Sequence, residues 1–186
     1  MKTYSTKQIR NIVLLGNSGS GKTTLAESLL FESGLIDRRG DVDNKNTVSD
    51  YNIIEQENGS SVFLSTLYTE WNNHKINILD APGADDFIGG AISGLYVADI
   101  AVLLVNCQHG VEVGTEIHNR WVKKTGKPMA FVINHCDHDK AHYEKTIETL
   151  KERFGAKTTT LQYPVNAGPG FDSIVDVVNM KLYKYP

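Results

Sequence analysis

One stretch near the N-terminus carries the clearest structural signal in the chain: Gly16-Asn17-Ser18-Gly19-Ser20-Gly21-Lys22-Thr23. It matches the pattern GxxxxGK(S/T), in which glycines let the backbone wrap around a phosphate. The pattern requires a strand before it and a helix after it. Both are indicated, because Ile12–Leu15 is an unbroken apolar run and Leu25 and Leu29 recur at helical spacing. The stretch predicts a phosphate-binding loop; the alternative is a glycine-rich turn that caps a helix.

The rest of the chain indicates the fold around this loop. Two further apolar runs, Ile100–Val105 and Met129–Ile133, are typical of strands buried on both faces. Helical patterns over 113–124 and 143–154 alternate with them, and residues 62–80 read as a pair of strands. We therefore expect an α/β fold, a P-loop NTPase with a mostly parallel sheet and helices on both faces.

Composition excludes several classes of protein. The chain has 186 residues, 40% hydrophobic and 22% charged, as expected for one globular domain. The net charge of −3 gives no general attraction for nucleic acid, so we expect no direct DNA binding. Its two cysteines cannot make a four-ligand zinc site. No signal peptide and no membrane-length apolar run are present, which predicts a cytoplasmic protein without membrane contact.

Two more motifs follow predicted strands. Asp80-Ala81-Pro82-Gly83 places a carboxylate where it can hold Mg²⁺ and a glycine N–H where it can reach a γ-phosphate. Asn134-His135-Cys136-Asp137 ends in a carboxylate that can accept from both N1–H and N2–H of guanine, a donor pair that adenine lacks. Alone, the first is usually a β-turn and the second an Asx-turn. In this order, the three motifs predict a guanine-nucleotide site.

The motif order resembles that of a translational GTPase, most closely the G domain of elongation factor G. The resemblance runs from about Arg10 to Lys184, and it includes Asp86-Phe87, Gly110-Val111-Glu112 and Phe154-Gly155-Ala156. Ribosomal-protection and release factor three-type GTPases share much of the pattern. The resemblance implies a switch that binds GTP or GDP with Mg²⁺ and acts on the ribosome.

Roles for individual residues follow from the same resemblance. Lys22, Ser61, Gly83 and Ala84 occupy the catalytic positions, and Thr23, Ser61 and Asp80 those of the metal ligands. The nucleotide-binding positions are Gly16, Asn17, Ser18, Gly19, Ser20, Gly21, Lys22, Thr23, Thr24, Asp80, Gly83, Asn134, His135 and Asp137.

Five positions depart from the family pattern. Where the family reads GHVDAGKT, Asn17 replaces the histidine and Gly19 the aspartate. Ser61 aligns with the threonine of the RGIT pattern, and a serine can still donate that ligand. His135 replaces the lysine of NKxD, which favours weaker nucleotide binding.

Ala84 is the largest departure, because the family reads DTPGH and its histidine positions the attacking water. A methyl group cannot hydrogen-bond to water, and loss of such a group costs roughly 10²–10⁴ in rate. We expect GTP binding to be retained and hydrolysis to be slow or absent. The alternative is that Asp85 or Asp86 orients the water instead.

The predicted organisation is a GTP-binding domain over residues 1–156, with switch I at about 34–61 and switch II at about 80–90. Residues 157–186 would begin the insert that interrupts the family's G domain. Alternatively, Asn166-Ala167-Gly168 is the loop that contacts guanine O6, and residues 171–178 begin a closing helix.

Two other functions stay open at this point. The first is a GTP-sensing, ribosome-binding module that does not hydrolyse, which Ala84 favours. The second is an ATP-using P-loop protein, for which Asp137 would be structural.

Overall fold

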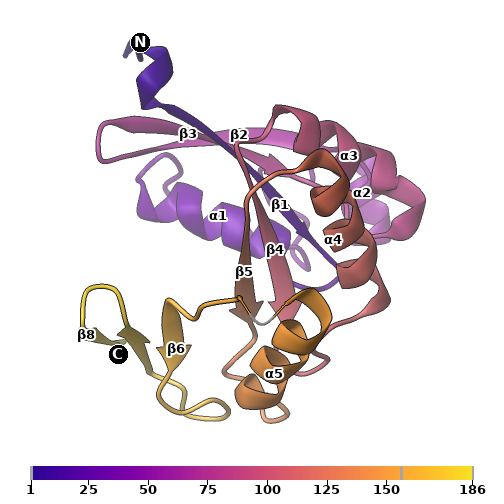
Figure 1. Cartoon of the computed structure of the whole chain (residues 1–186). Coiled ribbons are helices and arrows are strands. Elements are labelled where there is room, and N and C mark those ends of the chain that lie inside the picture. The colour runs from indigo at the N-terminus through magenta and orange to yellow at the C-terminus, as the bar shows by residue number, and fades with distance from the viewer. Residues whose placement is uncertain (1, 156, 186) are drawn as a thin grey trace. The chain divides into compact units, whose positions relative to one another are not determined.

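The computed structural model describes residues 2–155 and 157–185 (Figure 1). The chain forms two compact units. The larger unit comprises Met1–Leu104 and Val113–Val132, and the smaller unit comprises Val105–Glu112 and Ile133–Pro186. Ala156, the last residue of the predicted GTP-binding domain, lies outside the described residues, and that domain boundary stays a prediction.

A five-stranded mixed sheet organises the first part of the chain. Its strand order is β2-β3-β1-β4-β5, made of β1 (Ile9–Gly16), β2 (Ser65–Trp71), β3 (His74–Asp80), β4 (Ile100–Asn106) and β5 (Met129–Asn134). β1 pairs in parallel with β3 and β4, and β2 pairs antiparallel with β3. The predicted α/β fold is confirmed. Because Leu14 pairs with Asp80, the loops after β1 and β3 leave the same edge of the sheet.

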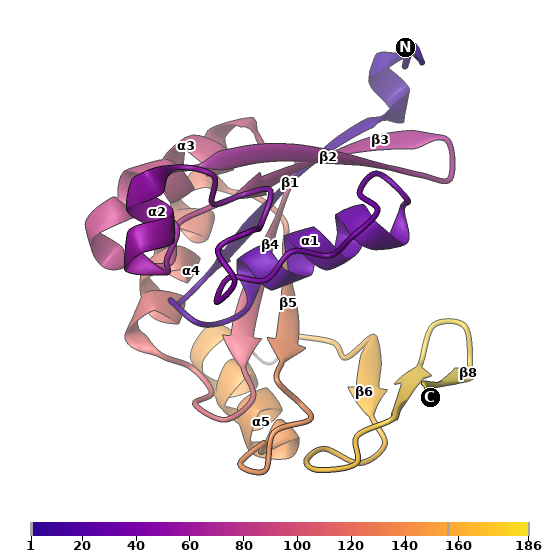
Figure 2. The same ribbon diagram turned by 180° about the vertical axis from the view of Figure 1, so that it is seen from behind.

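Helices cover both faces of this sheet in the larger unit (Figures 1 and 2). On one face α1 (Lys22–Glu32) buries Ala26 against Leu14 and Ile78. On the other face, α3 (Ile88–Val97) and α4 (Val113–Thr125) pack on residues of β1 and β4. The alternation of side chains along buried parallel strands supplies an apolar row to each face, which is why both need a helical cover.

Two of the helices have no periodic signal in the sequence. Within the polar connector 34–61, α2 (Ile53–Asn58) begins at a capping box of Asn52 and Glu55 and ends at Gly59, whose φ is 61°. An Asn three residues before a Glu is a helix-start signature, so the pattern was present. α3 is a glycine-rich apolar run, and a Cβ on Gly94 would lie 2.9 Å from Val13 Cγ2, which shows how closely this helix approaches β1.

The remaining elements complete the chain. Two short 3₁₀ helices are η1 (Thr6–Gln8) and η2 (Asp85–Phe87). In the smaller unit, α5 (Tyr143–Phe154) precedes an antiparallel sheet of β6 (Gln162–Pro164), β7 (Ser173–Asp176) and β8 (Lys181–Lys184). The alternative of a closing helix over 171–178 is therefore wrong: the β-branched Ile174 and Val175 lie in a strand. Over the described residues, we find no helix whose length and apolar character would let it span a bilayer.

Candidate functional site

The glycine-rich loop after β1 has the conformation that its sequence demands. Gly16 has a φ of 140°, and a Cβ there would lie 2.5 Å from the carbonyl oxygen of Leu104. Gly21 is left-handed, with φ 92°, and α1 begins at the next residue. A side chain is thus excluded at Gly16, and glycine is favoured at Gly21. The loop delivers backbone N–H groups to the N-terminus of α1, the arrangement that binds phosphate.

Lys22 is buried at the start of α1. Its Nζ donates to the carbonyl oxygens of Gly16 and Asn17, at 3.0 Å each. Burial lowers the pKa of Lys22 to about 8, although Asp80 and Asp50 oppose the shift. An ammonium that two loop carbonyls hold in this way lies beside the loop and is available to a phosphate that enters it.

Thr23, Asp80 and Ser61 come together next to Lys22. The Thr23 hydroxyl donates to Asp80 Oδ2 at 2.8 Å, and its oxygen lies 3.3 Å from the Ser61 hydroxyl. These are the three residues that the sequence assigned to Mg²⁺, and they come from α1, the end of β3 and the connector after α2. Hydroxyl and carboxylate oxygens are the ligands that Mg²⁺ takes together with phosphate and water.

The carboxylates at this site fit a cation. Burial raises the pKa of Asp80 to about 6, although the hydroxyls of Thr23 and Ser49 lower it. Its Oδ1 is buried and, within the described residues, has no partner of hydrogen-bond geometry. Asp50 is also buried, and burial raises its pKa, which the Ser61 hydroxyl counteracts. Two desolvated carboxylates with spare oxygens gain from a divalent cation, so the residues present fit Mg²⁺.

No cluster of three or more His, Cys, Asp or Glu that could hold a metal by itself occurs in residues 2–155 and 157–185. A cation at this site would therefore depend on hydroxyls, water and the phosphates of a bound nucleotide for the rest of its ligands.

The residues after β3 lie against the glycine-rich loop. A Cβ on Gly83 would stand 2.7 Å from the backbone nitrogen of Ser18. Ala84 follows as a half-buried residue that caps η2, while Asp85 and Asp86 in that turn are exposed. Ala84 brings only a methyl group to this turn.

The remaining loop residues have different surroundings. Ser18, Gly19 and Thr24 are exposed, and Ser20 is buried, with its N–H donating to the Asn17 carbonyl at 3.2 Å. The Asn17 side chain lies so close to α4 that a Cβ on Gly114 would collide with its Oδ1.

The motif assigned to guanine lies in the smaller unit, at the end of β5. The Asn134 carbonyl accepts from the Cys107 N–H at 2.8 Å, and His135 adopts a left-handed φ of 59°. His135 is half-buried, with an Nε2 that has no partner within the described part of the chain, and Asp137 is exposed. Asn134 and Asp137 therefore flank one tight turn, and the Asp137 carboxylate faces solvent.

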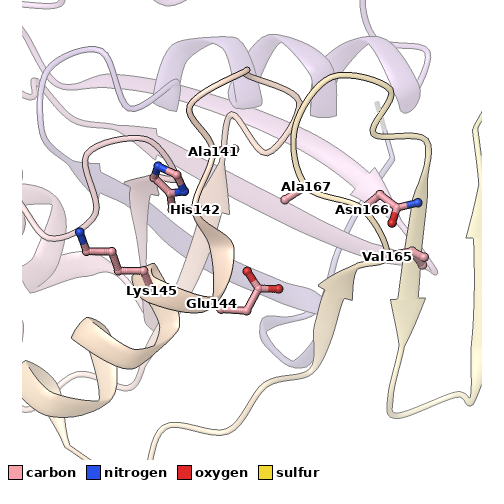
Figure 3. Close-up of a pocket in the computed structure, with 7 residues that line it drawn as sticks. All are labelled: Ala141, His142, Glu144, Lys145, Val165, Asn166 and Ala167. Atoms are coloured by element: carbon pink, nitrogen blue, oxygen red, sulfur yellow. The ribbon is translucent and has the colours of Figure 1, made fainter.

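A second loop of the smaller unit contacts this turn. The Gly168 N–H donates to the Cys136 carbonyl at 2.7 Å, so residues 166–168 lie beside the motif. A nearby pocket with a volume of about 550 Å³ lies between the start of α5 and residues 165–167 (Figure 3). It is lined by Ala141, His142, Glu144, Lys145, Val165, Asn166 and Ala167, and neither Asn134 nor Asp137 is among its lining residues.

Several buried polar residues near the site carried no sequence signal. Asp50 lies in a connector with several other Asp and Asn residues, so nothing in the sequence distinguishes it from them. Glu27 and His118 lie inside helices, where the apolar periodicity carries no information about polar residues, and their exposed fractions are 0% and 1%. Burial of a charged or polar side chain is a tertiary property that periodicity does not reveal.

Comparison with known proteins assigns the family. The sequence profile of the elongation factor Tu GTP binding domain matches residues 7–183, nearly the whole chain. The chain belongs to this GTP-binding domain family. Within it, the chain is 34% identical over 179 residues to an elongation factor G-like protein of Thermotoga maritima, covering 96% of this chain and 26% of the relative. It is 37% identical over 180 residues to the mitochondrial ribosome-releasing factor 2 of Drosophila ananassae, and the match covers 97% of this chain and 24% of the relative.

A solved structure agrees with the family assignment. A crystal structure of a protein from Thermus thermophilus matches with a TM-score of 0.91 and 32% identity, over 96% of this chain and 27% of that one. This GTP-binding domain chain thus spans about a quarter of the length of the relatives that it matches. The predicted resemblance to the G domain of elongation factor G is confirmed at the level of the family.

Proposed function

We propose that this chain is the guanine-nucleotide-binding domain of an elongation factor G-like translation factor, which binds Mg²⁺ with GTP or GDP and switches conformation on the ribosome. One observation carries the proposal: Thr23 Oγ1 lies 2.8 Å from Asp80 Oδ2 and 3.3 Å from Ser61 Oγ, directly beside the glycine-rich loop. Three oxygens from separate segments, next to a buried lysine, serve a phosphate–metal pair better than any purely structural purpose.

Each residue has a defined task in this proposal. The N–H groups of the loop and of α1 hold the phosphates, and Lys22 exchanges its two carbonyl acceptors for phosphate oxygens. Thr23, Ser61 and Asp80 hold Mg²⁺, which, when bound, neutralises phosphate charge. Asn134 and Asp137 select guanine, and His135 lies along the nucleotide in place of the family's lysine. Gly16–Thr24 and Gly83 form the remaining contacts to the phosphates.

The two switches would be residues 34–61 and 80–90, and movement would come from the ribosome's different affinities for the GTP and GDP states. Hydrolysis would be slow, because Ala84 provides no group that orients the attacking water. Roughly 10²–10⁴ in rate depends on such a group.

A second candidate shares the nucleotide site and differs in chemistry. In it, the protein senses GTP and occupies its ribosomal site without turnover, and Ala84 is the residue that favours it. The translation step also differs between relatives, since one is named elongation factor G-like and another ribosome-releasing factor 2. Ribosomal-protection and release-factor-type GTPases use the same motifs, so elongation and ribosome release are the two steps to compare.

The first experiment tests nucleotide binding by this chain. A fluorescent GDP analogue with Mg²⁺ should bind and be displaced by GTP but not by ATP at similar concentration. Thr23→Ala should remove most of the gain in affinity that Mg²⁺ gives. Ser28→Ala is the matched control on the same helix, because the exposed Ser28 hydroxyl donates to the Thr24 carbonyl of its own helix, at 2.8 Å. Displacement by ATP would instead support the ATP-using alternative.

The second experiment separates the two candidates. Phosphate release from GTP is measured with and without ribosomes. Slow, ribosome-stimulated release is expected for the GTPase, whereas binding without release above background would favour the non-hydrolysing module.

A further inference from the structure

Helix α1 carries a buried acid one turn beyond its phosphate-binding start. Lys22 and Thr23 form its first residues, and Glu27 follows with an exposed fraction of 0%. Within the described residues, no cationic side chain pairs with Glu27. A carboxylate removed from water without a counter-charge is costly unless strong donors surround it, so its partners indicate its role.

Those partners are backbone groups of switch I. Glu27 Oε2 accepts from the Gly40 N–H at 2.9 Å, and Oε1 accepts from the Val48 N–H at 2.5 Å. The two N–H groups belong to opposite ends of the loop 40–48. One carboxylate therefore holds both ends of this loop against α1. Hydrogen bonds from N–H groups to an ionised carboxylate are about twice as strong as those between neutral groups.

The held loop leads directly to the metal site. The Asp50 N–H donates to the Thr47 hydroxyl at 3.2 Å, and the Ser49 carbonyl accepts from the Ser65 hydroxyl at 2.7 Å. Asp50 then contacts Ser61, whose hydroxyl lowers the pKa of the Asp50 carboxyl. A second buried acid, Glu55, fixes the chain just after Ser61.

Glu55 does so through one oxygen, Oε1, which accepts from the N–H groups of Val62 and Phe63, each at 3.0 Å. Glu55 is 1% exposed. Val48 is thus held on α1 by Glu27, and the residues that follow Ser61 are held on α2 by Glu55. Ser61 lies between these two points and stands beside Thr23 of α1.

We propose that Glu27 is the positioning residue of switch I: it ties loop 40–48 to α1 and thereby sets Asp50 and Ser61 beside Thr23. The inference rests on the proposed function, since the group that it positions is the Mg²⁺ site. Glu27 is not among the residues proposed to bind nucleotide or metal, and its partners are the Gly40 and Val48 N–H groups. Its effect is transmitted along a loop whose two ends are held on the same helix.

Amide hydrogen exchange tests the tether without nucleotide. Glu27→Gln keeps the size of the side chain but turns an NH₂ donor toward one of the two N–H groups. Exchange at Gly40 or Val48 should accelerate about tenfold or more, because the free energy of local opening is then lower. Glu32→Gln, an exposed acid on the same helix, is the control and should leave both amides unchanged. Exchange within about twofold of the wild type at both amides in Glu27→Gln would overturn the inference.

Nucleotide affinity tests the consequence for the metal site. Glu27→Gln should weaken Mg²⁺-dependent GTP binding by about 10-fold to 100-fold, the usual effect of removing a group that orients metal ligands. In EDTA, affinity for GDP should change by less than about twofold. Equal weakening in both conditions would mean that Glu27 supports the phosphate loop instead, and would overturn the inference. Failure of the wild-type chain to bind guanine nucleotide would overturn the proposed function. The exchange experiment would still show whether Glu27 holds loop 40–48 on α1.

A second variant reaches the same contact from the loop. A Cβ on Gly40 would lie 2.6 Å from the Asn46 carbonyl oxygen and 2.8 Å from Glu27 Oε2. Gly40→Ala therefore displaces the loop while α1 keeps its carboxylate, and it serves if Glu27→Gln does not fold. Accelerated exchange at Val48 and loss of the Mg²⁺-dependent affinity are expected; unchanged values for both would overturn the inference.

Discussion

Gly83 lies directly against Lys22, because a Cβ on Gly83 would stand only 2.5 Å from the Lys22 Nζ. The two residues are far apart in the sequence, yet β1 and β3 pair in parallel and bring their following loops to one edge. The backbone of Gly83 and the ammonium of Lys22 therefore lie next to each other. The glycine is required for this approach, whatever ligand occupies the space.

Gly83→Ala should weaken binding of GTP more than binding of GDP. The added methyl group would meet the Lys22 ammonium and, at 2.7 Å, the backbone nitrogen of Ser18, which cannot swing away as a side chain can. Because the added methyl group displaces switch II, we expect GTP affinity to fall roughly tenfold or more. Competition with a fluorescent analogue measures this affinity. Gly89→Ala is the control, because a Cβ there meets nothing within 4 Å. Equal affinities in the two variants would contradict the prediction.

Ala84→His should raise GTP turnover on the ribosome by about a hundredfold or more, the scale of a positioned water-orienting group. Affinity for GTP should stay unchanged, since Ala84 follows the glycine that lies against Lys22 and is not itself proposed to contact the phosphates. Single-turnover phosphate release measures the rate. Brisk turnover by the natural chain that Asp85→Asn or Asp86→Asn abolishes would show that one of these acids already orients the water.

The fold was largely predictable because buried parallel strands leave an unmistakable trace. The apolar runs at 12–15, 100–105 and 129–133 all lie in strands of the sheet. The connector was harder, since α2 is held by a capping box and by Glu55 rather than by an apolar stripe. α3 was not predicted because its glycines dilute the apolar periodicity; one of them, Gly94, packs closely on Val13 of β1.

The residues of the site also differ in how far the sequence predicts them. Lys22, Thr23 and Asp80 belong to motifs with fixed spacing, so local sequence was enough to predict that they come together. Glu27 and Asp50 act only through contacts made across the fold, and nothing in their neighbourhood distinguishes them from surface acids. Motifs reveal residues that touch a ligand, whereas residues that position others emerge only when burial is known.

Asp137→Asn should change base selection rather than abolish folding, because Asp137 is exposed. An amide NH₂ would oppose the N2 amino group of guanine but could donate to the C2 carbonyl of xanthine. We expect guanine nucleotide affinity to fall by about 2 kcal/mol, the cost of an unpaired donor, and affinity for xanthosine diphosphate to rise. Competition binding measures both. Asp139→Asn, also exposed, is the control; unchanged guanine affinity in Asp137→Asn would support an Asx-turn role for the motif.

His118 should make the chain acid-sensitive. Its ring is buried in α4, and burial lowers its pKa from 6.5 to about 4; the Lys22 charge lowers it further and the Gly16 backbone opposes the shift. Between pH 6.5 and 4, the unfolded chain therefore takes up a proton at His118 that the folded chain does not. The stability that this residue contributes is complete above pH 6.5 and is lost as the pH falls through that window. The difference amounts to about 3 kcal/mol. Urea unfolding measures the free energy of unfolding at about pH 7 and about pH 4. Between these two pH values, His118→Gln should lose less of this free energy than the wild type does. His109→Gln, a substitution of an exposed histidine, is the control and should behave like the wild type. Equal acid losses in all three proteins would mean that the folded chain protonates His118 without cost.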